Sequence, residues 1–208
     1  LQNSDSKLDW IYADPSRRNT LKRKVFLLKD CEPNIPKNID FLFTKTSTIL
    51  LKLAPILDIK SAVNELKFVN EIHIVAVENE VKELLFMLQK DYIKPIKIKT
   101  INLLKTNHQK FSFEFNSKAK STFSEPLTYL YEPNSAVLKS GGFNHISQYF
   151  NINKIHQHSH LYTSNKLIDF PGRRFKINKI TSYNKKEIKK LIPSKKANIT
   201  TRNFPETV

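Results

Sequence analysis

The stretch that decides the fold is "LDWIYADPSRRN", from Leu8 to Asn19. Residues 8–13 are mostly apolar, and this run stops at Asp14-Pro15 because proline has no backbone N–H with which to continue a strand ladder. The segment therefore predicts a short sheet strand with Asp14 at its carboxyl end. The two arginines that follow are expected on a loop.

Two strand–helix units are expected next. The first is a strand over residues 48–53 (TILLKL), closed by Ala54-Pro55, and then a helix with its apolar face along residues 59–66. The second is a strand over 71–77 (EIHIVAV), and then a helix whose apolar residues have i, i+3, i+4, i+7 spacing: Val81, Leu84, Leu85 and Leu88. A further strand over 96–104 and an antiparallel edge strand around "KFSFEFN" (110–116) complete the pattern.

Strands that alternate with helices over about 100 residues indicate βαβ units, so we expect an α/β fold with a mixed, mostly parallel sheet. In such sheets ligands bind beyond the carboxyl ends of the strands, which is where Asp14 is expected.

The polar stretch "SKAKSTFSEP" (117–126) marks a boundary, after which the pattern changes to a small α+β region. Asn134 or Ser135 can cap a helix that runs to about residue 149, with Gly141-Gly142 either breaking it or allowing close backbone approach. Strands are expected around residues 155–162 and 173–180, and a short basic helix over 185–191.

The chain is strongly basic, with 35 Lys and Arg against 19 Asp and Glu, a formal net charge of +16. Residues 1–105 hold 18 basic and 13 acidic residues, whereas residues 106–208 hold 17 and 6, so the excess lies mainly in the second half. A field of this sign favours polyanions such as RNA, although a lysine-rich surface can also serve only to keep a protein dissolved.

The Asp-Pro-x-Arg-Arg turn is the sharpest candidate for chemistry. The Asp14 carboxylate can accept hydrogen bonds from a ligand, Pro15 stiffens the turn, and Arg17 and Arg18 present forked donors that suit phosphate. The alternative is an ordinary turn that ends a strand and carries solvated arginines.

"DWIYADPSRR" resembles the fourth motif of class I S-adenosylmethionine-dependent methyltransferases. Other fragments are similar to a bacterial group in which this domain carries a THUMP-like C-terminal region: "LLKLAPILDI" (50–59), "VENEVKELL" (77–85), "YLYEPNSAVLKSGGF" (129–143), "SHLYTS" (159–164), "FPGRRF" (170–175) and "ANITTRNFP" (197–205). The resemblance implies the C-terminal half of a Rossmann-like methyltransferase sheet over residues 1–122. A ferredoxin-like segment over 123–170 and a partial THUMP-like RNA-binding segment over 171–208 would follow.

In that group a glycine-rich loop after the first strand binds S-adenosylmethionine, but here the only glycines are Gly141, Gly142 and Gly172. We therefore expect a chain that is truncated at both ends, enters the sheet at its fourth strand, and is inactive alone. Ser16 and Arg17 replace the Pro-aromatic pair of the amine-methylating relatives. The cysteine nucleophile of uracil-methylating relatives is also missing, since residues 53–55 read Leu-Ala-Pro.

The remaining reactive residues are less informative. Cys31 lies between Asp30 and Glu32, whose charges disfavour a thiolate, so we interpret it as structural. In a strand, successive histidines of "HQHSH" (156–160) would lie about 6.6 Å apart, which is too far for all three to bind one zinc ion. No metal site is expected.

The interpretation that follows is a methyltransferase fragment acting on structured RNA, tRNA or rRNA, with Asp14 and Pro15 as catalytic residues. Arg17, Arg18, Glu78 and Asn79 are the candidate target-binding residues, although the glutamates around Glu78 can equally belong to the first turn of a helix. The expected RNA-binding residues form the basic tail: Arg173, Arg174, Lys176, Lys185, Lys186, Lys189, Lys190 and Arg202.

Two alternatives remain open. The basic tail can be a solvated helix that does not bind RNA, and the protein can be a non-catalytic RNA-binding protein with a degenerate methyltransferase fold. The N-terminus has no signal-peptide pattern and no apolar run is long enough for a membrane span, so a cytoplasmic protein is expected. The sequence indicates nothing about the oligomeric state.

Overall fold

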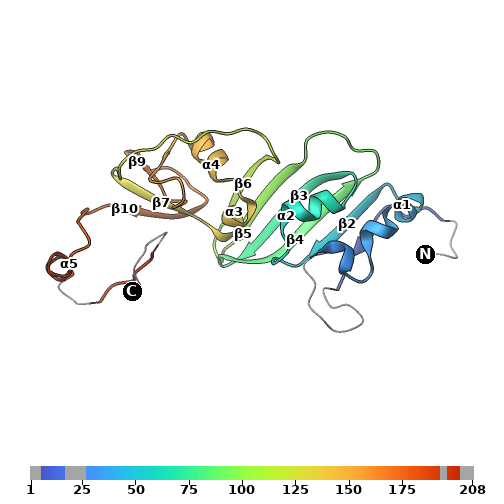
Figure 1. Ribbon diagram of the computed structural model, residues 1–208, viewed down its shortest axis with the longest axis horizontal. Coiled ribbons are helices and arrows are strands. Elements are labelled where there is room, and N and C mark those ends of the chain that lie inside the picture. Colours follow the sequence, from blue (N-terminus) through green and yellow to red (C-terminus); the bar gives the residue numbers. More distant parts are fainter. Residues whose placement is uncertain (1–5, 17–26, 193–195, 202–208) are drawn as a thin grey trace. The chain divides into compact units, whose positions relative to one another are not determined.

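The computed structural model describes residues 6–16, 27–192 and 196–201. The chain divides into two compact units (Figure 1). Unit 1 contains residues 1–118 and 134–142, and unit 2 contains residues 119–133 and 143–208. The short segment 134–142 thus belongs to unit 1 although unit 2 surrounds it in the sequence. No helix in the described part of the chain is both long and apolar enough to cross a membrane.

Unit 1 is built on a six-stranded sheet in the order β1-β2-β4-β3-β5-β6. Its strands are β1 (Ile11–Ala13), β2 (Thr48–Leu53), β3 (Val69–Val77), β4 (Glu80–Gln89), β5 (Lys97–Leu103) and β6 (His108–Glu114). The pairs β1–β2 and β3–β5 are parallel, and the pairs β2–β4, β3–β4 and β5–β6 are antiparallel. The mixed α/β sheet and its antiparallel edge strand β6 are therefore confirmed.

The helix predicted through Val81 to Leu88 is wrong, because these residues form strand β4. Glu78 and Asn79 both have positive φ, 48° and 64°, as a two-residue hairpin turn of type I′ requires. The chain therefore folds straight back on β3 instead of entering a helix. Since β4 is antiparallel to both of its neighbours, fewer strand pairs are parallel than the sequence analysis predicted.

One face of this sheet is covered by helices. These are the 3₁₀ helix η1 (Leu28–Asp30), α1 (Ile35–Lys45), α2 (Ile59–Glu65) and α3 (Ser135–Ser140), and α2 and α3 lie in front of the sheet in Figure 1. Helix caps define their starts: Asn34 Oδ1 accepts from Lys37 N at 2.9 Å, and Asp58 Oδ1 accepts from Ser61 N at 2.7 Å. Alternate strand residues such as Leu51, Ile74 and Phe86 are fully buried under the helices.

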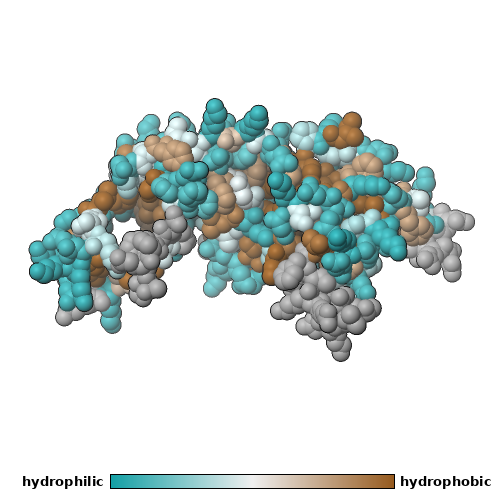
Figure 2. Space-filling model, in the orientation of Figure 1, coloured by the Kyte–Doolittle hydropathy of each residue, from teal (hydrophilic) through white to brown (hydrophobic). Residues whose placement is uncertain are grey.

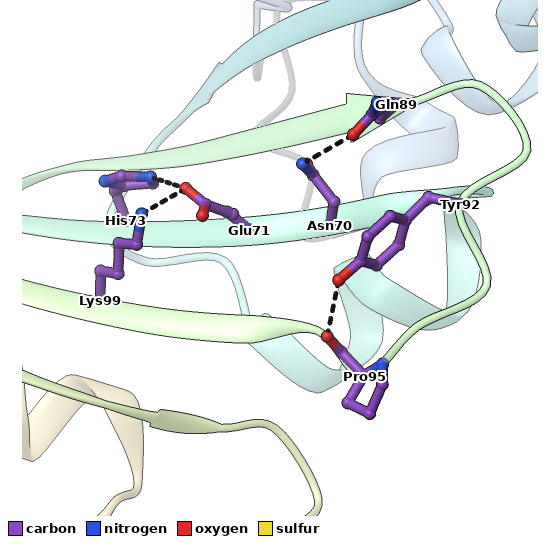
Figure 3. Close-up of polar contacts among 7 residues, drawn as sticks. All are labelled: Asn70, Glu71, His73, Gln89, Tyr92, Pro95 and Lys99. Atoms are coloured by element: carbon purple, nitrogen blue, oxygen red, sulfur yellow. Dashed lines mark hydrogen bonds and ion pairs between the residues drawn. The ribbon is translucent and has the colours of Figure 1, made fainter.

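The opposite face of the sheet is only half-buried, and among the described residues none of its side chains belongs to the core cluster. It carries a polar group at its centre, where Glu71 Oε2 lies 2.7 Å from Lys99 Nζ and 2.9 Å from His73 Nε2 (Figure 3). Partial burial opposes ionisation of Glu71, but the hydrogen bonds from Lys99 and His73 outweigh it and lower the pKa of the carboxyl group.

Unit 2 contains a four-stranded antiparallel sheet in the order β10-β7-β9-β8. Its elements are β7 (Tyr129–Pro133), α4 (Phe143–Phe150), β8 (Asn153–Lys154), β9 (Tyr162–Ser164), β10 (Gly172–Lys176) and α5 (Lys185–Leu191). Tyr131 and Tyr162 are fully buried and contact Phe170. The predicted helix after Asn134 does break at Gly141, which has a φ of 71° and ends α3. The predicted strand over 155–162 is wrong, since residues 155–161 form a loop between β8 and β9.

Replacing Phe86 by alanine should lower the free energy of unfolding by about 3–5 kcal/mol, because it removes a fully buried ring from β4 and leaves a cavity. Urea unfolding followed by circular dichroism measures the change. Ile93→Ala is the control, since Ile93 is 92% exposed and its loss should change stability by less than about 0.5 kcal/mol. Equal effects of the two substitutions would contradict the position of β4 in the core.

Candidate functional site

Asp14 follows the last residue of β1, as the sequence predicted. Pro15 is buried, and Ser16 pairs with Glu32: Ser16 N donates to Glu32 O at 2.7 Å, and Glu32 N donates to Ser16 O at 3.1 Å. The chain beyond Asp14 is therefore bound to the segment that precedes α1. Arg17 and Arg18 lie outside the described residues.

The Asp14 carboxylate forms an ion pair with a lysine of the neighbouring strand. Asp14 Oδ2 lies 2.6 Å from Lys52 Nζ, and Lys52 Nζ lies 3.8 Å from Glu83 Oε1 on β4. These three side chains come from the adjacent strands β1, β2 and β4. They lie where the parallel strands β1 and β2 end and β4 begins, which is the edge where ligands bind in α/β sheets.

This cluster carries one ammonium and two carboxylates. The Asp14 carboxylate raises the pKa of the Lys52 ammonium above its usual value; partial desolvation opposes the effect, and Glu83 adds to it. Neither Lys52 nor Glu83 was among the predicted site residues. A signal for Lys52 was present, since it is the only charged residue of the strand "TILLKL".

Glu78 and Asn79 form the turn between β3 and β4, and strands β2 and β4 separate β3 from β1. Asn79 N donates to Asn102 Oδ1 at 2.9 Å, and Asn79 Oδ1 accepts from Ser135 N at 2.8 Å. The Asn79 side chain is therefore engaged at the start of α3. The structure does not bring Glu78 or Asn79 into the cluster around Asp14, and the helix start that was the alternative for Glu78 is absent.

The two arginines on β10 are both engaged within unit 2. Arg173 Nε donates to Glu132 Oε2 at 2.7 Å, its Nη2 forms a second bond with the same oxygen, and the Glu132 side chain is only 8% exposed. Arg174 Nη1 lies 3.3 Å from Ile168 O and 3.6 Å from Asp169 Oδ1. These guanidinium groups keep some exposure, but part of their charge is already neutralised.

The lysines of α5 are arranged differently. Lys185, Lys186, Lys189 and Lys190 are all exposed, and Figure 2 shows hydrophilic side chains gathered at the place of α5. Among the described residues, one of these lysines forms an ion pair: Lys190 Nζ lies 3.3 Å from Glu187 Oε1. Phe175 and Tyr183, which flank the basic residues, are 43% and 64% exposed. Lys176 is also exposed on β10, and Arg202 lies outside the described residues.

The histidines occupy the loop between β8 and β9, so the spacing expected from a strand does not apply to them. His156 Nδ1 accepts from His158 N at 3.2 Å, and the ring of His160 stacks on Phe143 with 3.6 Å between the ring centroids. In the described part of the chain no three His, Cys, Asp or Glu residues are grouped so that they could hold a metal ion. Cys31 is buried in the core of unit 1.

The three glycines do not form a loop that could cradle a nucleotide cofactor. Gly141 ends α3, and a Cβ on Gly142 would lie 2.6 Å from the Phe113 ring. A Cβ on Gly172 would lie 2.0 Å from the backbone oxygen of Glu132. Gly141 therefore serves a positive φ at the end of α3, and Gly142 and Gly172 serve close packing, so the residues present do not fit the glycine-rich site of S-adenosylmethionine.

Two domain families match the second part of the chain. Residues 129–171 match a ferredoxin-like domain, and residues 172–208 match a THUMP domain-like family. No curated protein matches the chain.

The whole chain is similar to a solved structure, the "putative methyltransferase" from Porphyromonas gingivalis W83, with 34% sequence identity and a TM-score of 0.84. The match covers 96% of this chain and 51% of that chain, so this chain spans about half the length of that protein. These matches support a methyltransferase-like architecture followed by a THUMP-like region.

Replacing Arg173 by methionine should lower the free energy of unfolding by about 2 kcal/mol, because it removes two charge-assisted hydrogen bonds to the buried Glu132 carboxylate. Arg174→Met should cost less than about 1 kcal/mol, since Asp169 is fully exposed to water. Chemical unfolding of the two variants measures both values. If Arg174→Met proved the more damaging of the two, the structural role given to Arg173 would be wrong.

Proposed function

We propose that this chain is the target-binding half of an S-adenosylmethionine-dependent methyltransferase that acts on structured RNA, tRNA or rRNA, in the cytoplasm. The observation that carries the proposal is the match to the P. gingivalis protein over 96% of the chain, together with Asp14 at the carboxyl end of β1. In this proposal residues 1–122 belong to the methyltransferase domain. Residues 123–170 form the ferredoxin-like segment, and residues 171–208 contribute to RNA binding.

The methyl donor would be held by a part of the protein outside this chain. S-adenosylmethionine supplies a methyl group that a nucleophile can accept, but the glycines of this chain serve a helix end and close packing. The contribution of this chain would therefore be the target side: Asp14 and Pro15 form the candidate site at the end of β1, and Asp14 orients the target or takes up its proton. Arg17 and Arg18 would bind a phosphate of the target. Glu78 and Asn79 lie two strands away from this site, so we give them no part in it.

RNA would be held mainly by the lysines of α5. Exposed ammonium groups with exposed rings beside them can neutralise phosphates and stack on unpaired bases. Arg173, Arg174 and Lys176 would extend this surface along β10. Because both arginines are engaged with groups of unit 2, we give them a smaller share of the affinity than the four lysines.

A second candidate is an RNA-binding protein without catalytic activity. It is favoured by Ser16-Arg17, which stand where amine-methylating relatives carry a Pro-aromatic pair. The Ser16 backbone is also bound to Glu32. Calorimetric titration of S-adenosylmethionine into the full-length protein separates the two functions. Binding favours the enzyme, whereas RNA binding without cofactor binding favours the second candidate.

Asp14→Ala in the full-length protein should lower the rate of methyl transfer to RNA by about tenfold or more, because the target loses its oriented acceptor. The measurement is incorporation of labelled methyl groups into RNA at saturating substrate. Asp40→Ala, at an exposed position on α1, is the control and should keep the parental rate. Equal rates for Asp14→Ala and the parent would refute the role of Asp14.

Replacing Lys185, Lys186, Lys189 and Lys190 together by glutamine should weaken RNA binding and make it less sensitive to salt. Each lost phosphate contact lowers the slope of log affinity against log salt concentration by about 0.7 for single-stranded RNA. Fluorescence anisotropy over a salt series measures the slope. The control removes the same charge elsewhere, by glutamine at the exposed lysines Lys60, Lys67, Lys90 and Lys94. If both sets lowered the slope equally, the effect would come from net charge and not from α5.

A further inference from the structure

Lys52 lies inside a strand of the sheet, whereas Asp14 lies just beyond the end of one. Lys52 lies between Leu51 and Leu53, which are buried on the helix-covered face, so its own side chain points to the opposite face. Strand β2 is paired on both sides, with β1 and with β4. Asp14, by contrast, follows the last ladder pair of the β1–β2 register, Ala13 with Leu51. The ion pair with Lys52 therefore connects the Asp14 side chain to the rigid part of the sheet.

The pair is too exposed to contribute much to stability. The side chains of Lys52 and Asp14 are 30% and 50% exposed, and ion pairs in contact with water stabilise a fold little. What the pair can do is fix geometry. The ion pair uses Asp14 Oδ2, which lies 2.6 Å from Lys52 Nζ, and so restricts the orientation of the carboxylate.

We infer that Lys52 is the positioning residue of the candidate site: it fixes the Asp14 carboxylate so that Asp14 can accept a hydrogen bond from the target. This inference rests on the proposed function and concerns how Asp14 orients the target. Glu83 lies on the far side of the Lys52 ammonium from β1, at 3.8 Å. Without a cation between them, Asp14 and Glu83 would be two carboxylates on one face of the sheet, and their repulsion would turn the exposed Asp14 side chain away from its present position.

The kinetic test uses the full-length protein. Lys52→Met should lower kcat for RNA methylation by about tenfold or more while the KM for RNA changes less than about twofold, because the target is misaligned but the RNA is held elsewhere. Lys52→Arg, which keeps a cation at this position, should recover most of the lost kcat. Lys67→Met is the matched control: Lys67 Nζ lies 2.8 Å from Asp40 Oδ2 in an ion pair on the helix side of unit 1. It should retain the parental kcat.

A second readout does not depend on methyl transfer. Since Asp14 raises the pKa of Lys52, Asp14→Asn should increase the fraction of neutral Lys52 amine and so speed its acetylation by acetic anhydride at pH 8 several-fold. Mass spectrometry of labelled peptides gives the rate, with Lys67 in the same sample as the internal reference. An unchanged rate for Lys52 would overturn the ion pair and the inference with it.

The outcomes separate the inference from the proposed function. If the parental full-length protein neither bound S-adenosylmethionine nor methylated RNA, the proposed function would fail, and with it the role given to Lys52. If the parent were active and Lys52→Met kept its kcat, the inference about Lys52 alone would be wrong. Activity that is lost in Lys52→Met and restored in Lys52→Arg would support both the proposed function and the positioning role of Lys52.

Discussion

Strand β4 is the element on which the architecture of unit 1 depends, because it hydrogen-bonds to β2 on one side and to β3 on the other. It joins the parallel pair β1–β2 to the parallel pair β3–β5, and no other described strand connects them. Its buried residues Leu84, Phe86 and Leu88 lie under the helices, in the centre of the core. The two-residue turn at Glu78 and Asn79 makes this arrangement possible, since it returns the chain directly along β3.

The insertion of β4 also creates the candidate site. An antiparallel strand beside β2 places its first residues at the same edge of the sheet as the last residues of β1 and β2. Glu83 therefore lies beside Lys52, and Lys52 beside Asp14. Had residues 81–88 formed a helix, as predicted, Glu83 would not lie on a strand beside β2. The charged cluster is thus a consequence of strand pairing and not of any local motif.

Unit 2 shows that residues with the same charge can have different roles. Arg173 is bound to a buried carboxylate across the β7–β10 pair, whereas the lysines of α5 are exposed. The planar guanidinium group suits the first task, because its Nε and Nη2 donors can reach the same carboxylate together. The ammonium group of lysine is a flexible point charge, which suits contact with phosphates in varied positions.

Several elements could be predicted from the sequence by itself, because their signals are local. Apolar runs closed by proline determined β1 and β2, alternation determined β6, and Gly141 determined the end of α3. The sequence also placed Asp14 at a strand end and the basic excess in the second half of the chain. Helix α1 was not predicted, nor was the loop over 155–161. For residues 81–88 the apolar residues satisfy both helical and strand periods, so the local pattern could not decide.

Tertiary structure decided the rest. Residues 81–88 form a strand because β2 and β3 both offer hydrogen-bonding edges to them, and this depends on residues that are distant in the sequence. In the same way, strand register brings Lys52 to Asp14, and the pairing of β7 with β10 brings Arg173 to Glu132. The residue types present were thus determined by the sequence, whereas the partner of each charge was decided by which strands lie side by side.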